Sequence, residues 1–216
     1  MRLKKNIILL GLLSVFALGQ FVLKGGYQHL DFFSDSYALS EDVKNNLTTS
    51  RGQFAADLSA VRLFDELTKD WIKEYKRTQG HFAIEPLAAA LELLPLKGKS
   101  AQALSRAKIL WKEGNIESVD VLVSSLIFDF DIPLSEIEAQ FGKKIAIYVS
   151  DLKKRAELDV DFMSEGAKVV TLADELYRLR ENKGIDQALA EEGAQSLKNL
   201  CGTNNALEKE ISRILN

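Results

Sequence analysis

The chain has 216 residues, a length that suits one domain with a short leader. Hydrophobic residues make up 46% of it and charged residues 27%, which are ordinary globular values and exclude general disorder. The formal net charge is −3, and no block of lysine and arginine provides the cationic face that nucleic-acid binding normally needs. We therefore expect a globular domain that does not bind nucleic acid.

The N-terminus has the pattern of an export signal. Residues 1–5 read MRLKK, and an uncharged apolar run follows at residues 6–23. With small residues at Ala17 and Gly19, residues 1–26 are typical of a cleavable signal peptide. If the run stays uncut, it is just long enough to anchor the chain in a membrane. Both interpretations place the domain outside the cytosol: secreted, periplasmic or membrane-anchored. The remaining alternative is a buried N-terminal helix of a soluble protein.

The next segment separates the leader from the domain. Residues 27–52 show no sustained periodicity, and we interpret them as a linker with room for a short helix. The globular domain then extends over residues 53–216. From Gln53 to Thr78, apolar residues recur every three or four positions, which predicts one long helix.

Shorter helices are predicted for the rest of the domain. They are expected at about residues 86–94, 100–110, 117–128 and 135–140. A longer helix then ends near residue 152, another begins after residue 166, and the last two lie at about residues 186–200 and 204–215. Pro86 opens the first of these at a position where its missing N–H costs nothing. Thr203 or Asn204 is expected to cap the last. The sequence therefore predicts an all-α bundle of about eight helices, preceded by the N-terminal hydrophobic segment.

Three uncommon residues lie at positions with apolar spacing. We interpret Trp71 and Trp111 as core residues. Cys201 is the only cysteine, so it cannot form an intrachain disulfide, and its neighbours Leu197 and Leu200 predict a buried thiol. The sequence contains no phosphate-binding P-loop, zinc-protease, paired-cysteine or serine-hydrolase motif.

Three stretches carry more information than the periodicity does. They read LSEIEAQFG at 134–142, GAKVVTLADELYRLR at 166–180 and GTNNALE at 202–208. In this order and spacing they resemble the HD hydrolases of the RelA/SpoT group, and most of all the small stand-alone alarmone hydrolases of the metazoan SpoT-homologue type. The resemblance extends over about residues 55–214 and implies an HD-domain-like fold.

The resemblance also implies a chemistry. Members of this family hold one divalent ion, typically manganese, with two histidines and two aspartates, and the ion activates water. A Glu–Asp pair one helical turn after the His–Asp pair assists the attacking water. The substrate is the guanosine tetraphosphate alarmone, cleaved at its 3′ diphosphate. The resemblance therefore implies a guanosine-3′,5′-bis(diphosphate) 3′-pyrophosphohydrolase-like protein.

Most positions that would carry this chemistry have changed in this chain. The first histidine of the family corresponds to Glu85. The His–Asp pair corresponds to Ser124 and Ser125, and the Glu–Asp pair to Phe128 and Asp129. Serine hydroxyls are poor neutral ligands, and phenylalanine cannot bind a metal ion at all.

Asp174 is the one metal-ligand position that keeps its residue type. On the same helix, the lysine of the family is Glu175 and its active-site asparagine is Arg178. The whole chain has only two histidines, His29 and His81, so the imidazole ligands cannot be supplied from another position. We expect Asp174 to be vestigial and to pair with a neighbour such as Arg178, one turn along the helix.

Two functions remain open at this point. The preferred one is a pseudoenzyme, exported or tethered through residues 6–23, that binds an unknown protein or a nucleotide-like ligand and uses no cofactor. The alternative is an active phosphohydrolase whose site is rebuilt from Glu85, Asp129 and Asp174, with manganese or another divalent ion. Export favours the first function, because the alarmone is a cytosolic nucleotide.

Overall fold

The computed structural model describes residues 39–55, 57–94, 99–182 and 187–216, which form ten α-helices and one short 3₁₀ helix. In chain order the elements are α2 Glu41–Gln53, α3 Leu58–Arg77, α4 Glu85–Glu92, α5 Ser100–Lys112, α6 Val119–Ile127, α7 Leu134–Phe141, α8 Lys143–Lys153, η1 Val160–Phe162, α9 Glu165–Glu181, α10 Gln187–Asn199 and α11 Asn205–Leu215. The all-α prediction is confirmed, and from α3 onward the predicted helices match these within a few residues. The predicted leader, residues 1–26, lies outside the described residues.

The predicted linker, residues 27–52, is not a linker throughout, because α2 occupies its second half. The hydroxyl of Ser40 accepts a hydrogen bond from the N–H of Val43 at the start of this helix, as N-cap residues do. Leu39, Val43 and Leu47 are spaced by four and are buried. The short helix for which the prediction left room is therefore present, although asparagine and threonine, which are weak helix formers, fill its other faces.

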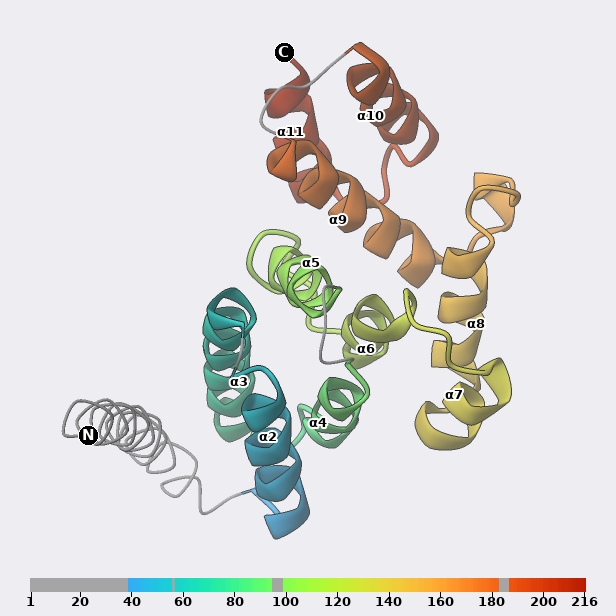
Figure 1. Cartoon of the computed structure of the whole chain (residues 1–216). Helices are drawn as coiled ribbons and strands as arrows, with labels where there is room; N and C mark the ends of the chain where they lie inside the picture. The colour runs from blue at the N-terminus through green and yellow to red at the C-terminus, as the bar shows by residue number, and fades with distance from the viewer. Residues whose placement is uncertain (1–38, 56, 95–98, 183–186) are drawn as a thin grey trace, which may run out of the picture. The chain divides into compact units, whose positions relative to one another are not determined.

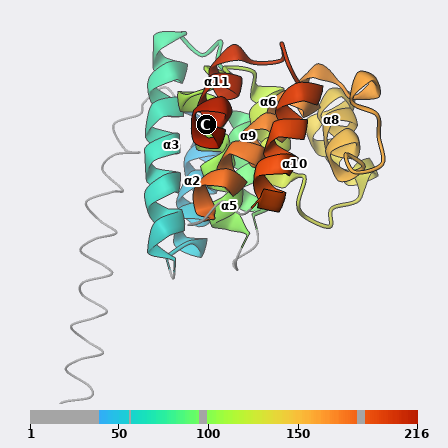
Figure 2. The ribbon, with the colours of Figure 1, turned by 90° about the horizontal axis from the view of Figure 1, so that it is seen from above.

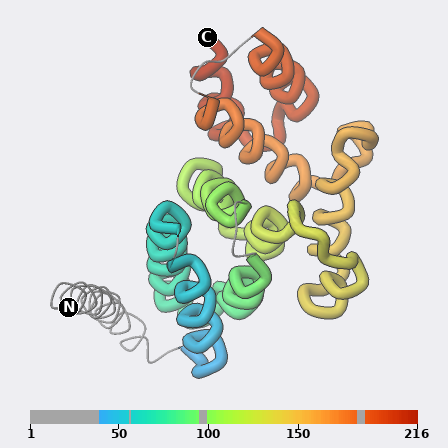
Figure 3. The backbone as a smooth tube through the Cα atoms, in the orientation of Figure 1, coloured from blue at the N-terminus to red at the C-terminus, as the bar shows by residue number. Residues whose placement is uncertain are grey.

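Residues Asn45–Asn216 form one compact unit, which contains α3 to α11. Within it, α9 packs against α5, α6, α8, α10 and α11, and α6 packs against α4, α5, α8 and α9 (Figures 1 and 3). The two last helices, α10 and α11, contact each other as well as α9 (Figure 2). Side chains from α5, α6 and α9 therefore share one interior.

Helix α3 shows how the sequence specifies these elements. The Asp57 side chain accepts hydrogen bonds from the N–H groups of Ser59 and Ala60, which satisfies the first turn. Phe64 and Trp71, seven residues apart on one face, are completely buried. The core position predicted for Trp71 is thus confirmed.

Two core predictions need correction. Trp111 is only partly buried, and its ring packs against Phe82 with the centroids 5.6 Å apart. Cys201 is exposed, not buried. Cys201 lies beyond the end of α10, in a turn that continues at Gly202, where φ is 87°. Because the backbone is no longer helical there, the spacing from Leu197 does not determine which way the Cys201 side chain points.

The C-terminal helix begins as the sequence predicts. The Asn204 side chain accepts hydrogen bonds from the N–H groups of Ala206 and Leu207, which confirms one of the two predicted caps. Among the helices of the described ranges, none combines the length and the apolar character needed to cross a bilayer.

Candidate functional site

The side chain of Arg106 lies where α5, α6 and α9 meet, and it is completely buried. Its Nη1 is 2.7 Å from Asp174 Oδ1, and its Nη2 is 2.7 Å from Asp129 Oδ2. Its Nε and Nη2 also donate hydrogen bonds to the backbone carbonyl oxygen of Ser125, at 3.2 and 2.8 Å. One guanidinium therefore connects two carboxylates and a carbonyl that belong to different elements.

Asp174, on α9, receives a second arginine. Arg155 Nη2 is 2.8 Å from Asp174 Oδ2, so each carboxylate oxygen has its own guanidinium. Burial alone would raise the pKa of Asp174, but Arg106 and then Arg155 outweigh it and hold the pKa below its ordinary value. Asp174 thus pairs across the fold and not with Arg178 as predicted. We call Arg106, Arg155, Asp129 and Asp174 the Arg106 network.

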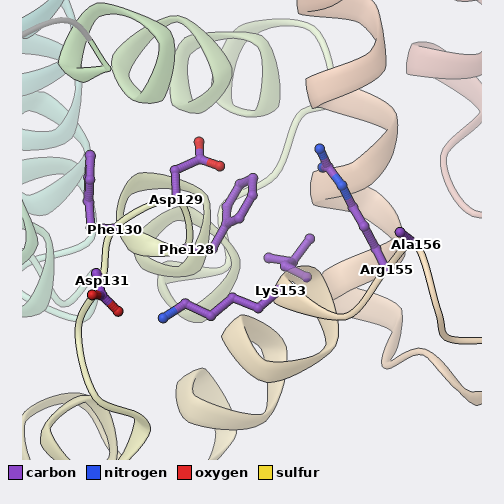
Figure 4. Close-up of a pocket in the computed structure, with 8 residues that line it drawn as sticks. Phe128, Asp129, Phe130, Asp131, Lys153, Arg155 and Ala156 are labelled. Carbon is purple, nitrogen blue, oxygen red and sulfur yellow. The ribbon is translucent and has the colours of Figure 1, made fainter.

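Phe128 and Asp129 follow α6 directly and approach Arg106 from one side. The Phe128 ring centroid is 4.1 Å from the guanidinium carbon of Arg106 and 5.5 Å from that of Arg155, within the range of cation–π contacts. Asp129 Oδ2 is close enough for an ion pair but lacks the angle of a hydrogen bond. Figure 4 shows the Phe128 ring between Asp129 and Arg155 in the wall of a cavity of about 450 Å³.

The hydroxyls of Ser124 and Ser125 are used within α6 itself. Ser124 Oγ donates to the carbonyl of Asp120 and Ser125 Oγ to that of Leu122, both at 2.7 Å. Both serines are completely buried. Only the backbone of Ser125 therefore contributes to the Arg106 network.

A second cavity, of about 240 Å³, lies beside α9 and α10, and Asp174, Glu175 and Arg178 line it. Arg178 Nη1 is 3.3 Å from Glu175 Oε2, and its Nη2 is 2.7 Å from Glu192 Oε2. Glu175 Oε1 is buried and has no hydrogen-bond partner. Burial raises the pKa of Glu175, and Arg178 offsets this only in part.

The remaining predicted positions lie apart from this cluster. Glu85 is the first residue of α4 and is exposed. Within the part of the chain that the structure describes, it makes no hydrogen bond or ion pair with the Arg106 network. His81 is exposed in the loop before α4, and His29 lies outside the described residues. The structure thus brings Asp129 and Asp174 together, but not Glu85.

Vertebrate proteins are similar in sequence to this chain. The human guanosine-3′,5′-bis(diphosphate) 3′-pyrophosphohydrolase MESH1 is 31% identical over 132 residues, which covers 50% of this chain and 74% of the human protein. The chain belongs to the MESH1 family. The Danio rerio MESH1 is 30% identical over 132 residues, with 50% of this chain and 73% of the relative covered.

One solved structure also shows a weak likeness to this chain. It is described as a metazoan ortholog of SpoT that hydrolyzes ppGpp, and it has 23% sequence identity and a TM-score of 0.44, over 52% of this chain and 76% of that chain. No protein-family model matches the chain. The resemblance to small stand-alone hydrolases that the sequence motifs predict is confirmed by the MESH1 relatives.

The residues present do not fit the metal centre that the MESH1-family resemblance implies. Both carboxylate oxygens of Asp174 face arginines, the hydroxyls of Ser124 and Ser125 bond to their own helix, and Phe128 has no ligand atom. Across residues 39–216, leaving aside the gaps noted above, no three or more His, Cys, Asp or Glu side chains are grouped so that they could hold a metal ion. We therefore assign no catalytic step that runs through such an ion.

Arg106 and Arg155 are the residues that sequence reasoning missed. Arg106 stands three residues after Ala103 and four before Leu110, both completely buried, so a charged residue occupies the apolar face of its helix. Charged residues at such positions are almost always paired, and this signal points to a buried partner. Arg155 follows α8 in an irregular segment and carries no comparable signal.

Replacing Glu175 by glutamine is expected to change the pH dependence of stability. Because the folded pKa of Glu175 is raised, its favourable contribution is complete below the unfolded pKa of about 4.3 and is lost as the pH rises through the folded pKa. The free energy of unfolding of E175Q relative to the wild type should therefore increase from pH 4 to pH 8, measured by urea unfolding. Glu165→Gln removes an exposed carboxylate that pairs with Lys168 and does not act on Glu175, so its stability should run parallel to that of the wild type across this pH range. If the free energies of unfolding of E175Q and the wild type change in parallel with pH, the pKa of Glu175 is not raised in the folded state.

Proposed function

We propose that this chain is a catalytically degenerate member of the MESH1 family that acts as a binding or regulatory module. The observation that carries the proposal is the buried Arg106 guanidinium between Asp129 and Asp174, positions that the resemblance assigns to metal-dependent hydrolysis. A fixed cation there repels a divalent ion and already neutralises the charges of both carboxylates. The side chains around Asp129 and Asp174 therefore disfavour the binding of an ion that would activate water.

The cavity beside α9 supports the same proposal. Glu175 has a buried carboxylate where the family resemblance implies a lysine, and Arg155 and Arg178 are already paired with carboxylates of this chain. A carboxylate next to a diphosphate repels it by several kcal/mol when both are desolvated. A protein or a nucleotide-like ligand with fewer charges suits this cavity better than the alarmone does.

We further propose that the domain is exported or tethered to a membrane. The support is the basic start followed by the apolar run at residues 6–23, which is typical of signal peptides and single anchors. A domain outside the cytosol would rarely meet a cytosolic nucleotide, which agrees with a binding role. Cell fractionation combined with N-terminal sequencing of the mature chain tests this part. A full-length chain found only in the soluble cytosolic fraction would contradict it.

The catalytic part is tested with the purified full-length chain. Release of pyrophosphate from guanosine 3′,5′-bis(diphosphate) is measured in an excess of manganese, and human MESH1 serves as the positive control in the same assay. We expect the human enzyme to turn over and this chain to remain at the level of the buffer. The purified chain should also carry well below one manganese ion per molecule by elemental analysis.

The same assay contains the result that would overturn the proposal. Robust release of pyrophosphate by the wild-type chain, abolished in Asp174→Asn, would show a working site that includes this carboxylate. Asparagine keeps the shape of the side chain, so the comparison tests charge and ligation more than packing. Circular dichroism of both proteins confirms that each is folded before turnover is compared.

A further inference from the structure

The cavity beside α9 and α10 is lined by Glu175, whose carboxylate has one oxygen without a donor. The Glu175 residue is 4% exposed, and its Oε1 accepts no hydrogen bond from the part of the chain that the structure describes. A Cβ on Gly193 would lie 3.4 Å from this oxygen, so Oε1 is located where α9 and α10 meet. A buried acceptor that stays unpaired costs free energy, and the cost is larger for a charged group. A donor from outside the chain would therefore be stabilised at Oε1.

The ion pairs around the cavity leave one negative charge in excess. In the Arg106 network two guanidiniums face two carboxylates, so its charges balance. Arg178, in contrast, is shared by Glu175 at 3.3 Å and Glu192 at 2.7 Å, and in the described ranges these three side chains form no other ion pair. The shorter contact goes to Glu192, so Glu175 receives the smaller part of the positive charge. A cationic N–H donor would balance the charge and satisfy Oε1 at the same time.

The other residues of the cavity restrict the rest of the ligand. Arg155 Nη1 is buried and donates no hydrogen bond to any described residue, so it can serve an acceptor. Since Asp174 already neutralises Arg155, an uncharged acceptor suits it better than a second carboxylate does. Val160, Met163 and Leu200 add apolar surface. The volume of about 240 Å³ is below the roughly 300–1,000 Å³ of most ligand pockets, which favours a ligand of few atoms.

We infer that this cavity binds a small aliphatic amine that carries a hydroxyl or another uncharged acceptor. The protonated nitrogen donates to Glu175 Oε1, the acceptor receives the Arg155 Nη1 donor, and the carbon chain lies against the apolar side chains. Arg178 lines the same cavity and is 41% exposed, so its side chain has room to move when the ligand enters. The inference rests on the proposed binding role and gives that role a defined class of ligand.

Binding of three amino alcohols to the full-length chain tests the inference. Leucinol, valinol and ethanolamine share an ammonium and a hydroxyl and differ in the length of the apolar chain. Saturation-transfer NMR at pH 7 detects the bound ligand, and its dependence on ligand concentration gives Kd. We expect leucinol to bind with a Kd on the order of 1 mM or lower, as suits a ligand of this size, and ethanolamine to bind most weakly.

Two probes separate the contributions of the ligand groups. Isohexanol has the branched chain and the hydroxyl of leucinol without its nitrogen, and isoamylamine keeps the nitrogen but lacks the hydroxymethyl group. Isohexanol should not bind, because the charge-assisted hydrogen bond to Glu175 is lost. Isoamylamine should bind several-fold more weakly than leucinol, because nothing accepts from Arg155. Binding of isohexanol as tight as that of leucinol would overturn the inference, and so would equal binding of isoamylamine.

Glu175→Gln tests the carboxylate with almost no change of shape. E175Q should weaken leucinol binding by about 10- to 100-fold, the range that corresponds to one hydrogen bond to a charged group. Glu165→Gln removes an exposed carboxylate that pairs with Lys168 and does not line the cavity, so its Kd should equal that of the wild type. Circular dichroism establishes that both variants are folded. A Kd of E175Q equal to that of E165Q would overturn the inference.

Ser196→Leu tests the cavity while Glu175 stays intact. Ser196 lines the cavity from α10, and a leucine there fills part of the space that the ligand needs, so S196L should abolish leucinol binding. Ala188→Leu places the same side chain on an exposed position of α10 that does not line the cavity, and it should bind like the wild type. Unchanged binding in a folded S196L would show that leucinol binds elsewhere and would overturn the inference.

Failure of this inference is distinguishable from failure of the proposed function. If none of the three amino alcohols binds the wild type, the amine site is wrong, whereas the pyrophosphate assay still decides whether the chain is catalytically degenerate. Release of pyrophosphate by the wild type overturns the proposed function and, with it, the binding role on which the amine site rests.

Discussion

Asp174→Ala is expected to lower the free energy of unfolding by about 3–5 kcal/mol, although it removes only one small side chain. The carboxylate is 3% exposed and carries contacts from both Arg106 and Arg155. Its loss leaves the completely buried Arg106 with Asp129 as its remaining counter-charge. An uncompensated buried charge costs far more than the packing of an aspartate, so the effect should exceed that of an ordinary surface substitution. Urea unfolding at pH 7 measures it.

Asp120→Ala is the matched control for this prediction. Asp120 also pairs with a cation, because its carboxylate is 2.8 Å from Lys144 Nζ. However, both side chains are more than a third exposed to solvent. An exposed pair of this kind contributes no more than about 1 kcal/mol. If D174A and D120A lose the same stability, the Arg106 network does not hold the domain together as described.

The sign of the pH dependence gives a second test of Asp174. Burial is the largest influence on its pKa and would raise it, but the two arginines lower the pKa below the ordinary value. The contribution of Asp174 is therefore present above the unfolded pKa of about 3.9 and is lost as the pH falls through the folded pKa. The difference between the wild type and D174A should accordingly be constant near neutrality and shrink in acid.

Gly166→Ala is the second substitution with a large expected effect, a loss of about 1–3 kcal/mol. Gly166 is buried near the start of α9, and a Cβ at this position would lie 2.2 to 2.6 Å from three ring atoms of Tyr148 on α8. Such distances force the ring or the helix to move, because carbon atoms do not approach so closely. Urea unfolding of G166A against the wild type measures the loss.

Two further variants show whether the Tyr148 ring is the cause. The double variant Y148A/G166A should lose less free energy of unfolding than the sum of the losses of Y148A and G166A, because the added methyl group meets no ring when Tyr148 is absent. Gly52→Ala adds the same methyl group to α2 where no atom lies within 4 Å, and it should be neutral or slightly stabilising. Additive losses in the double variant would contradict the proposed close approach.

The helical part of the fold could be predicted because its signals are local. The spacing of Phe64 and Trp71, the proline at residue 86 and the cap at Asn204 each act within a few residues, and the structure confirms them. The bounds of helix α2, for which the sequence only left room, could not be predicted because its polar faces lower the average helix propensity. Cys201 was misplaced because periodicity was extended past the end of its helix.

The candidate site was predictable only in part. The motifs pointed to Asp129 and Asp174, and the structure brings both to one guanidinium. The identity of that guanidinium was out of reach, because Arg106 and Asp174 are 68 residues apart and no local rule relates them. The shorter pair with Arg178 was preferred because residues one helical turn apart can interact, whereas the structure pairs Arg178 with Glu175 and Glu192.

The exposed turn after α10 has a practical consequence for testing whether this domain binds a ligand. Cys201 is the sole cysteine of the chain, and it follows Leu200, which lines the same cavity as Asp174 and Glu175. A maleimide fluorophore will couple to this thiol in one-to-one stoichiometry without any engineered attachment point. Its emission can then report compounds or peptides that enter the cavity, in a screen that requires no turnover.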